Sequence, residues 1–215
     1  MSTFIRSAER MTLVPKRTII PRGNGTQDSS LYRFTVKQYH EMIDAGILTE
    51  NDPVELLDGW IVEKMPRNAP HDASISCTTR KFIHILPDDW VLRVQCALTL
   101  RNSEPEPDFA IVRGPERSFS RRKPRARDAR LVVEVSARSL LFDRGWKLQL
   151  YAGARIPEYW IVNVVDNCVE VYTDPKGGRS PSYRRRVVYT EEPAIRLVLD
   201  GRHIADISAR DLLPA

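Results

Sequence analysis

The stretch that decides the fold runs from Leu131 to Val162 and reads LVVEVSARSLLFDRGWKLQLYAGARIPEYWIV. It begins with an almost continuously apolar run, Leu131–Val135, which is typical of a strand buried on both faces. A helical pattern over Asp143–Ala154 follows, and Tyr159–Val162 is a second apolar run. A strand, a helix and a strand in this order predict a βαβ unit with a right-handed crossover. We therefore expect parallel strands at the centre of a sheet.

Shorter elements are expected on either side of this unit. Asp58-Gly59 separates two short apolar runs and is a strong hairpin signal. The expected helices cover residues 36–45 and 73–86, and the other expected strands cover residues 54–57, 60–62, 90–95, 97–101, 107–112, 168–173, 183–189 and 195–199. These elements predict an α/β fold with antiparallel hairpins at the sheet edges. We expect one domain over residues 31–215, preceded by a flexible basic arm over residues 1–30.

The composition limits the class of protein. Apolar residues make up 42% and charged residues 28% of the 215 residues, which is ordinary for a globular protein and excludes global disorder. No run approaches the roughly 20 apolar residues that a membrane span needs, so we expect no membrane protein. The three cysteines form no CxxC pair, which indicates neither a zinc site nor a disulfide framework. Since residues 1–25 do not resemble a secretory signal, a cytoplasmic location is expected.

The net charge of +5 is concentrated in three basic segments. Residues 1–25 carry +4, residues 113–130 carry +6 and residues 176–186 carry +5, which leaves −10 for the rest of the chain. Such segments suit a polyanionic partner. The middle segment joins two expected strands, and its candidates for contact with the phosphate backbone of DNA are Arg121, Arg122, Lys123, Arg125 and Arg127. The alternative is a solvated, mobile surface loop.

One charged residue interrupts the apolar run Leu131–Val135. Glu134 would carry a charge into a strand buried on both faces, which is unfavourable unless the carboxylate meets a metal, a cation or a proton. Alternatively, it lies near the strand end and pairs with an arginine. Asp108 follows Pro107, which lacks an amide hydrogen and is confined to a strand start or edge. We therefore expect the side chain of Asp108 near an end of the sheet.

The helix that follows Glu134 adds three polar side chains on one face. Asp143, Lys147 and Tyr151 are spaced by four residues, so they share a side of the helix. Carboxylates bind Mg²⁺, which retains waters and takes phosphate oxygens, and a lysine can orient water or stabilise developing charge. The alternative is an ordinary surface ion pair between Asp143 and Lys147.

The joint pattern of these motifs resembles a known family. The matching segments are Glu55–Gly59, His71, Pro107-Asp108, Glu134–Ser136, Asp143…Lys147…Tyr151 and Glu158–Val162. Together they look like the Uma2 family of restriction-endonuclease-like proteins in the PD-(D/E)XK nuclease superfamily. The similarity runs from Tyr32 to the C-terminus. It implies a restriction-endonuclease-like mixed sheet flanked by helices, with a metal site at one sheet end.

The resemblance also implies roles for individual residues. Asp108 and Glu134 would bind Mg²⁺ or Mn²⁺, with Glu55 as a candidate third ligand. The usual lysine of the superfamily, two residues after the glutamate, would fall at Ser136, so the cation would come instead from Lys147. The supporting residues would be Asp143, Tyr151, His71 and Ser136. For His71, the alternative is a helix-start residue that bonds to the backbone.

Two functions follow from this resemblance. The first is a Mg²⁺-dependent endonuclease that hydrolyses phosphodiester bonds of DNA; related nucleases often act as homodimers to cut two strands. In the second, the same fold is a catalytically silent module that binds nucleic acid or protein. There, Lys147 would neutralise Glu134 as a structural ion pair.

Overall fold

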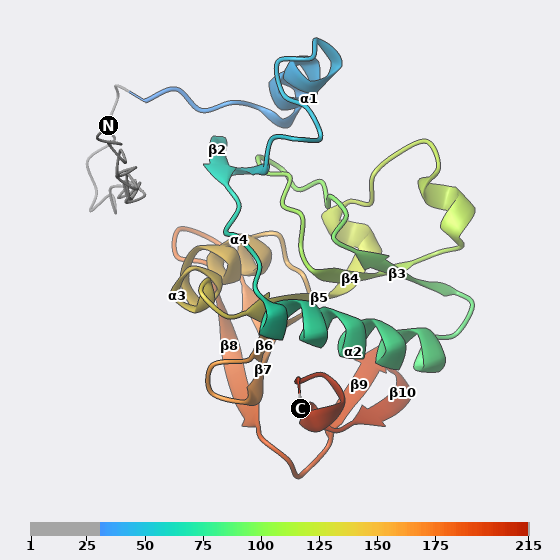
Figure 1. The fold of residues 1–215 in the computed structure, drawn as a ribbon. Helices are drawn as coiled ribbons and strands as arrows, with labels where there is room; N and C mark the ends of the chain where they lie inside the picture. The colour runs from blue at the N-terminus through green and yellow to red at the C-terminus, as the bar shows by residue number, and fades with distance from the viewer. Residues whose placement is uncertain (1–30, 215) are drawn as a thin grey trace, which may run out of the picture. The chain divides into compact units, whose positions relative to one another are not determined.

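The fold is described for residues 31–214 of a computed structural model (Figure 1). Its centre is a six-stranded sheet in the order β3-β4-β5-β6-β7-β8. The strands are β3 (Trp90–Val94), β4 (Phe109–Arg113), β5 (Ala129–Ser136), β6 (Glu158–Asn163), β7 (Cys168–Lys176) and β8 (Ser182–Tyr189). Strand β5 runs parallel to β6, and the other neighbouring pairs are antiparallel, which confirms the mixed α/β sheet. The arm predicted over residues 1–30 lies outside the described residues.

The parallel pair at the sheet centre confirms the predicted βαβ unit. Strands β5 and β6 pair in register, with Glu134 opposite Ile161. The crossover consists of α3 (Leu140–Phe142), a π-helical turn (Asp143–Lys147) and α4 (Leu148–Gly153). The helical segment therefore starts three residues earlier than predicted and is not α-helical throughout.

Two apolar cores cover the two faces of the sheet. On one face, α2 (Ala69–Ile85) lies across the strands (Figure 1), and Phe82 contacts Phe109 and Trp160, both with ring centroids 6.2 Å away. At 17 residues, α2 is the longest helix between residues 31 and 214, and none of the helices there is both long and apolar enough to cross a membrane.

The opposite face is covered by the helical segment 140–153. Tyr151 of α4 contacts Tyr159 of β6, with ring centroids 5.1 Å apart, and both side chains are fully buried. Glu134 projects to this same face, because it alternates along β5 with Val133 and Val135 of the other core. Glu134 therefore lies beneath the helical segment that carries Asp143, Lys147 and Tyr151.

The first helix and hairpin of the described chain lie almost where the sequence predicts them. They are α1 (Val36–Asp44), β1 (Val54–Leu57) and β2 (Trp60–Glu63). Thr35 caps α1, because its side chain accepts a hydrogen bond from the amide of Gln38. In the hairpin turn, Asp58 and Gly59 have φ values of 48° and 83°, which this type of tight turn requires. A Cβ atom on Gly59 would also lie 2.7 Å from Cβ of Arg33, so the close approach of the chain demands glycine there.

Two of the predicted elements need correction. Residues 97–101 form no strand, apart from one isolated bridge at Thr99, because the chain leaves the sheet at Gln95, where φ is 50°. Helix α2 begins four residues before the predicted position. It does so because the side chain of Asn68 caps it by accepting a hydrogen bond from the amide of His71 at 3.1 Å.

A second hairpin near the C-terminus was only half predicted. Strand β9 (Ile195–Leu199) was expected, but its partner β10 (Arg202–Ile207) was not. The turn between them is Asp200-Gly201, with φ values of 47° and 80°. The same dipeptide, Asp-Gly, forms the turn of the β1–β2 hairpin, so the sequence contains a signal for this second hairpin as well.

Candidate active site

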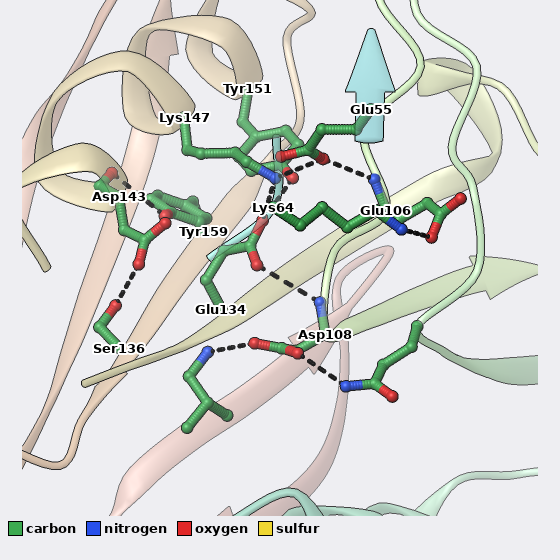
Figure 2. A network of polar contacts seen from close by, with 12 residues as sticks. Glu55, Lys64, Glu106, Asp108, Glu134, Ser136, Asp143, Lys147, Tyr151 and Tyr159 are labelled. Atoms are coloured by element: carbon green, nitrogen blue, oxygen red, sulfur yellow. Dashed lines mark hydrogen bonds and ion pairs between the residues drawn. The ribbon is translucent and has the colours of Figure 1, made fainter. Parts of the chain in front are cut away.

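The candidate site lies where β4 and β5 pair, at one end of the sheet (Figure 2). Phe109 pairs with Val133, so Asp108 stands opposite Glu134. The backbone amide of Asp108 donates to Glu134 Oε2 at 3.4 Å, and the amide of Val135 donates to Asp108 Oδ2 at 2.8 Å. The strand register therefore holds the two carboxylates side by side.

Lys147 joins Glu134 to a third carboxylate, from the β1–β2 hairpin. Its Nζ donates to Glu55 Oε2 at 2.8 Å and lies 3.2 Å from Glu134 Oε1. Tyr151, one turn further along the helix, donates its hydroxyl to Glu134 Oε1 at 2.6 Å. Glu55 Oε2 also accepts the amide of Glu106 at 3.0 Å. Figure 2 shows Lys147 and Tyr151 reaching Glu134 from the same helical segment.

The π-helical turn places Asp143 and Lys147 inside the fold. The amide of Leu148 donates to the carbonyl of Asp143, five residues back, so the helix is locally widened. Ser136 Oγ donates to Asp143 Oδ2 at 2.6 Å, and the hydroxyl of Tyr159 donates to the carbonyl of Asp143 at 3.2 Å. Such single π-helical turns are frequent at functional sites.

Asp108 is held from its other side by His71 and Gln95. Gln95 Nε2 donates to Asp108 Oδ1 at 3.1 Å, and His71 Nε2 lies 3.2 Å from Oδ2. Burial opposes ionisation of both Asp108 and His71, but their hydrogen bond and opposite charges lower the pKa of Asp108 and raise that of His71. Gln95 was not predicted as a site residue, because it faces Asp108 only once β3 and β4 are paired.

Negative charge exceeds positive charge in this cluster. Four carboxylates, those of Glu55, Asp108, Glu134 and Asp143, lie around Lys147, the one buried lysine among residues 31–214. Burial raises the pKa of Glu134 to about 8, although the charge of Lys147 opposes this shift. Burial also raises the pKa of Asp143 to about 6. Burial lowers the pKa of Lys147, but the charges of Glu134 and Glu55 outweigh that effect and raise it. The lysine therefore stays protonated, but its single charge does not balance the carboxylates of the cluster.

The sequence matches the Uma2 family model, described as "putative restriction endonuclease", over residues 36–206. The chain belongs to the Uma2 family. A solved structure of similar fold is that of a putative nuclease from Anabaena variabilis, with a TM-score of 0.60 and 14% sequence identity over 83% of this chain and 97% of that chain. No curated protein matches the sequence. The family indicates a nuclease-like function, and the solved structure supports the fold.

In this Uma2 chain, the lysine of the site comes from the helical crossover. Ser136, at the position where the superfamily's lysine was expected, donates to Asp143 instead. Lys147 reaches Glu134 from the π-helical turn, with its Nζ 3.2 Å from Glu134 Oε1. All eight predicted catalytic, metal-binding and supporting residues come together in one network. They are Glu55, His71, Asp108, Glu134, Ser136, Asp143, Lys147 and Tyr151.

The donor set fits a divalent cation of the Mg²⁺ type. Between residues 31 and 214, no three His, Cys, Asp or Glu side chains converge to form a complete ligand set. Mg²⁺ seldom requires one, because it is usually bound by one or two carboxylates with waters and substrate oxygens. Asp108 and Glu134 supply such a pair, and Glu134 Oε2 receives only the long hydrogen bond from Asp108. Burial raises the pKa of Glu134 and the neighbouring carboxylates add to the shift, so a cation there would favour the ionised form that binds metal.

The basic loop between β4 and β5 uses part of its charge in ion pairs. Lys123 pairs with the buried Glu104, and Arg122 pairs with Asp128 at 2.6 Å. The other three predicted DNA contacts are exposed and make no ion pair within the described part of the chain: Arg121, Arg125 and Arg127. The prediction that this loop contacts DNA therefore rests on three arginines rather than on five cations.

Proposed function

We propose that this Uma2 protein is an endonuclease that uses Mg²⁺ or Mn²⁺ to hydrolyse phosphodiester bonds of DNA. The observation that carries the proposal is the buried cluster in which Glu134 lies between Asp108 and Lys147 with a shortage of positive charge. A divalent cation and a phosphodiester group are the partners that such a cluster suits chemically. Membership of a family described as restriction-endonuclease-like supports the same reaction class.

The side chains take distinct roles in this proposal. Asp108 and Glu134 would hold the cation, with Glu55 as a third candidate ligand. When bound, the cation supplies an activated water and screens the charge that develops on the phosphate. Lys147 is positioned by Glu55 so that its ammonium group can orient the attacking water or donate to a phosphate oxygen. Tyr151 fixes the orientation of Glu134 through its 2.6 Å hydrogen bond.

The basic loop suits contact with a phosphate backbone better than base stacking on single-stranded RNA. Its exposed arginines can contact phosphate groups, which DNA and RNA share. Its one aromatic residue, Phe119, is buried beneath the guanidinium of Arg122, 5.1 Å from the ring centroid, so it offers no platform for base stacking.

A cleavage assay on the full chain tests the proposal. Supercoiled plasmid would be nicked or linearised with Mg²⁺ or Mn²⁺ but not with EDTA, and Asp108→Asn and Glu134→Gln would abolish the reaction. Glu158→Gln is a matched control, because Glu158 is a half-buried glutamate at the opposite end of the parallel strands, with a pKa raised by burial to about 7. Cleavage that survives both site substitutions would refute the assignment. Linear duplex, single-stranded DNA, RNA and a branched junction complete the substrate panel.

One observation favours the alternative of a catalytically silent module. Lys147 already meets both Glu55 and Glu134, which is the structural neutralisation that this alternative requires. Calorimetric titration of Mn²⁺ separates the two functions. A nuclease binds Mn²⁺ in the wild type and loses it in Glu134→Gln, whereas a silent module binds none at millimolar metal in either protein.

A further inference from the structure

Among residues 31–214, the lysine and arginine side chains that are at least partly buried have carboxylate partners, with one exception. Six lysine and arginine side chains between residues 31 and 214 are at least partly shielded from solvent: Lys64, Lys81, Arg93, Arg130, Arg144 and Lys147. Five of them form ion pairs, with Glu106, Asp211, Asp200, Glu170 and Glu55 respectively. Arg93 forms no ion pair or hydrogen bond in the described chain, and its Nε is buried without a hydrogen-bond acceptor.

A buried N–H donor is unfavourable unless it finds a hydrogen-bond acceptor. Folding removes water from the Nε–H of Arg93 and supplies no protein acceptor in exchange. The guanidinium group remains charged at physiological pH, so proton loss offers no relief. An anion with two acceptor oxygens matches the geometry of the guanidinium fork.

The register of the sheet places Arg93 on the face that carries the site. Arg93 pairs with Ala110 of β4, which in turn pairs with Val132 of β5. Ala110 lies two residues after Asp108, and Val132 lies two residues before Glu134. Because side chains alternate along strands, Arg93 faces the same side of the sheet as both carboxylates. It lies on the strand next to that of Asp108, at a strand spacing of about 4.8 Å.

The negative charge of the site explains why a nucleic-acid strand would need a cation such as Arg93. The ionised carboxylates of the cluster repel a polyanion, and Lys147 is enclosed by Glu55 and Glu134. A strand of nucleic acid therefore needs a further cation beside the cluster in order to approach it. Arg93 is a cation on that face of the sheet, and no carboxylate of the described residues forms an ion pair with it.

We propose that Arg93 binds a phosphodiester group of the nucleic-acid strand, next to the phosphate that is cut. The inference rests on the proposed nuclease function and adds an anion-binding residue to it. Arg93 is a positioning residue, since it binds the nucleic-acid strand and takes no part in bond cleavage. Its contact with the strand does not require the metal.

Binding measured without metal tests this role. Fluorescence anisotropy of a labelled DNA duplex would be followed in EDTA over a range of salt for the full-length wild type, Arg93→Gln, Arg93→Lys and Arg80→Gln. Arg80 is the matched control, because it is exposed on α2, which covers the opposite face of the sheet. We expect Arg93→Gln to bind about tenfold more weakly and to reduce the slope of log K against log salt by about 0.9, the value for one phosphate contact. Arg93→Lys should keep the slope but lose affinity, and Arg80→Gln should match the wild type.

The outcomes separate this inference from the proposed function. If Arg93→Gln binds like the wild type while Asp108→Asn abolishes cleavage, the Arg93 contact is refuted and the nuclease assignment stands. If the wild type does not cleave DNA but Arg93→Gln still weakens DNA binding, the nuclease assignment is refuted and the Arg93 contact stands. Failure of the wild type to bind any nucleic acid would refute the contact. So would stabilisation by inorganic phosphate that depends on Arg93 while duplex binding does not.

Thermal unfolding of the free protein excludes a purely structural role. Arg93→Gln removes no hydrogen bond or ion pair within the described chain and takes away a buried donor that has no acceptor, so its melting temperature should equal or exceed that of the wild type. A structural arginine would instead lower the melting temperature in both Arg93→Gln and Arg93→Lys and leave the salt slope unchanged. That combination would overturn the inference.

Discussion

Two buried glutamates face the same side of the sheet, two strands apart, yet they have opposite surroundings. Glu134 pairs with Ile161, which pairs with Glu170. Glu170 accepts hydrogen bonds from Arg144, Arg186, Tyr172 and Asn163, so that its pKa falls to about 2 although burial opposes the shift. Glu134 shares one lysine with neighbouring carboxylates, and burial raises its pKa to about 8.

The difference shows that burial of a carboxylate does not by itself indicate a functional site. Glu170 pairs with two arginines, so its charge is fully compensated. Through Arg144 it links the helical crossover to β7, and we call it the clamp. Glu134 has too little, so it remains open to a proton or a divalent cation. The balance of charge around each carboxylate therefore distinguishes the structural glutamate from the one that we propose as a metal ligand.

The π-helical turn links the two clusters and offers the sharpest test of their difference. Arg144 donates to Glu170 at 2.9 Å, whereas Lys147 on the same turn donates to Glu55 and contacts Glu134. We expect Lys147→Met to lower cleavage by about 10²–10³-fold, because it removes the cation at the reacting phosphate. Arg144→Met should keep cleavage within about tenfold and lose about 1–2 kcal/mol of unfolding free energy.

Plasmid cleavage and urea unfolding of the two variants measure this contrast, with circular dichroism to verify the fold. Equal loss of cleavage in both would mean that the turn acts as a single structural unit. The assignment of a separate chemical role to Lys147 would then be wrong.

The same substitution in the two glutamates should affect stability very differently. Glu170→Gln removes an ionised carboxylate from two arginines and should cost about 3 kcal/mol, in line with the depressed pKa. Glu134→Gln at pH 7 replaces a mostly protonated carboxyl in the metal-free protein and should change stability by less than about 1 kcal/mol. Urea unfolding in EDTA measures both values. A large loss in Glu134→Gln would show that Glu134 is also a structural ion-pair partner.

Of the two glutamates, only Glu134 is predicted as a site residue, although the local sequence around Glu170 shows the same pattern. Glu134 interrupts the apolar run Leu131–Val135, and Glu170 interrupts the apolar run Cys168–Tyr172 in the same way. The pattern therefore reveals a buried charge in each strand. Which cations meet each charge depends on the strand register and on the π-helical turn, and neither of these has a signature in the local sequence.

The other site features also divide into those that have a local sequence signal and those that depend on strand pairing. The βαβ unit and the placement of Asp108 at a strand start could be predicted from apolar runs and from Pro107. Gln95 and Arg93 could not, because their relation to Asp108 exists only after β3 pairs with β4. Local signals thus reveal elements and anomalous charges, whereas contacts across strands require the fold.

The pH dependence of stability should have opposite signs for the two glutamates. Glu170 has a folded-state pKa of about 2, below its usual value, so its contribution is present above pH of about 4.5 and is lost as the pH falls towards 2. Glu134 has a folded-state pKa of about 8, so the metal-free protein should lose stability as the pH rises from about 4.5 to 8. Urea unfolding from pH 3 to pH 8 in EDTA should show a shallower acid limb for Glu170→Gln and a flatter neutral limb for Glu134→Gln. Parallel profiles in the two variants would contradict the difference in charge balance.

The smallest effects come from a matched pair of tyrosines. Tyr151 donates to Glu134 and Tyr172 donates to Glu170, each at 2.6 Å. Tyr172→Phe removes a hydrogen bond to an ionised carboxylate and should cost about 2 kcal/mol, whereas Tyr151→Phe removes one to a mostly neutral carboxyl and should cost about 1 kcal/mol. In Mn²⁺ titrations only Tyr151→Phe should weaken binding, because it alone frees the orientation of a ligand. Equal stability losses together with equal Mn²⁺ affinities would mean that the two glutamates carry the same charge, and the distinction between clamp and metal site would then fail.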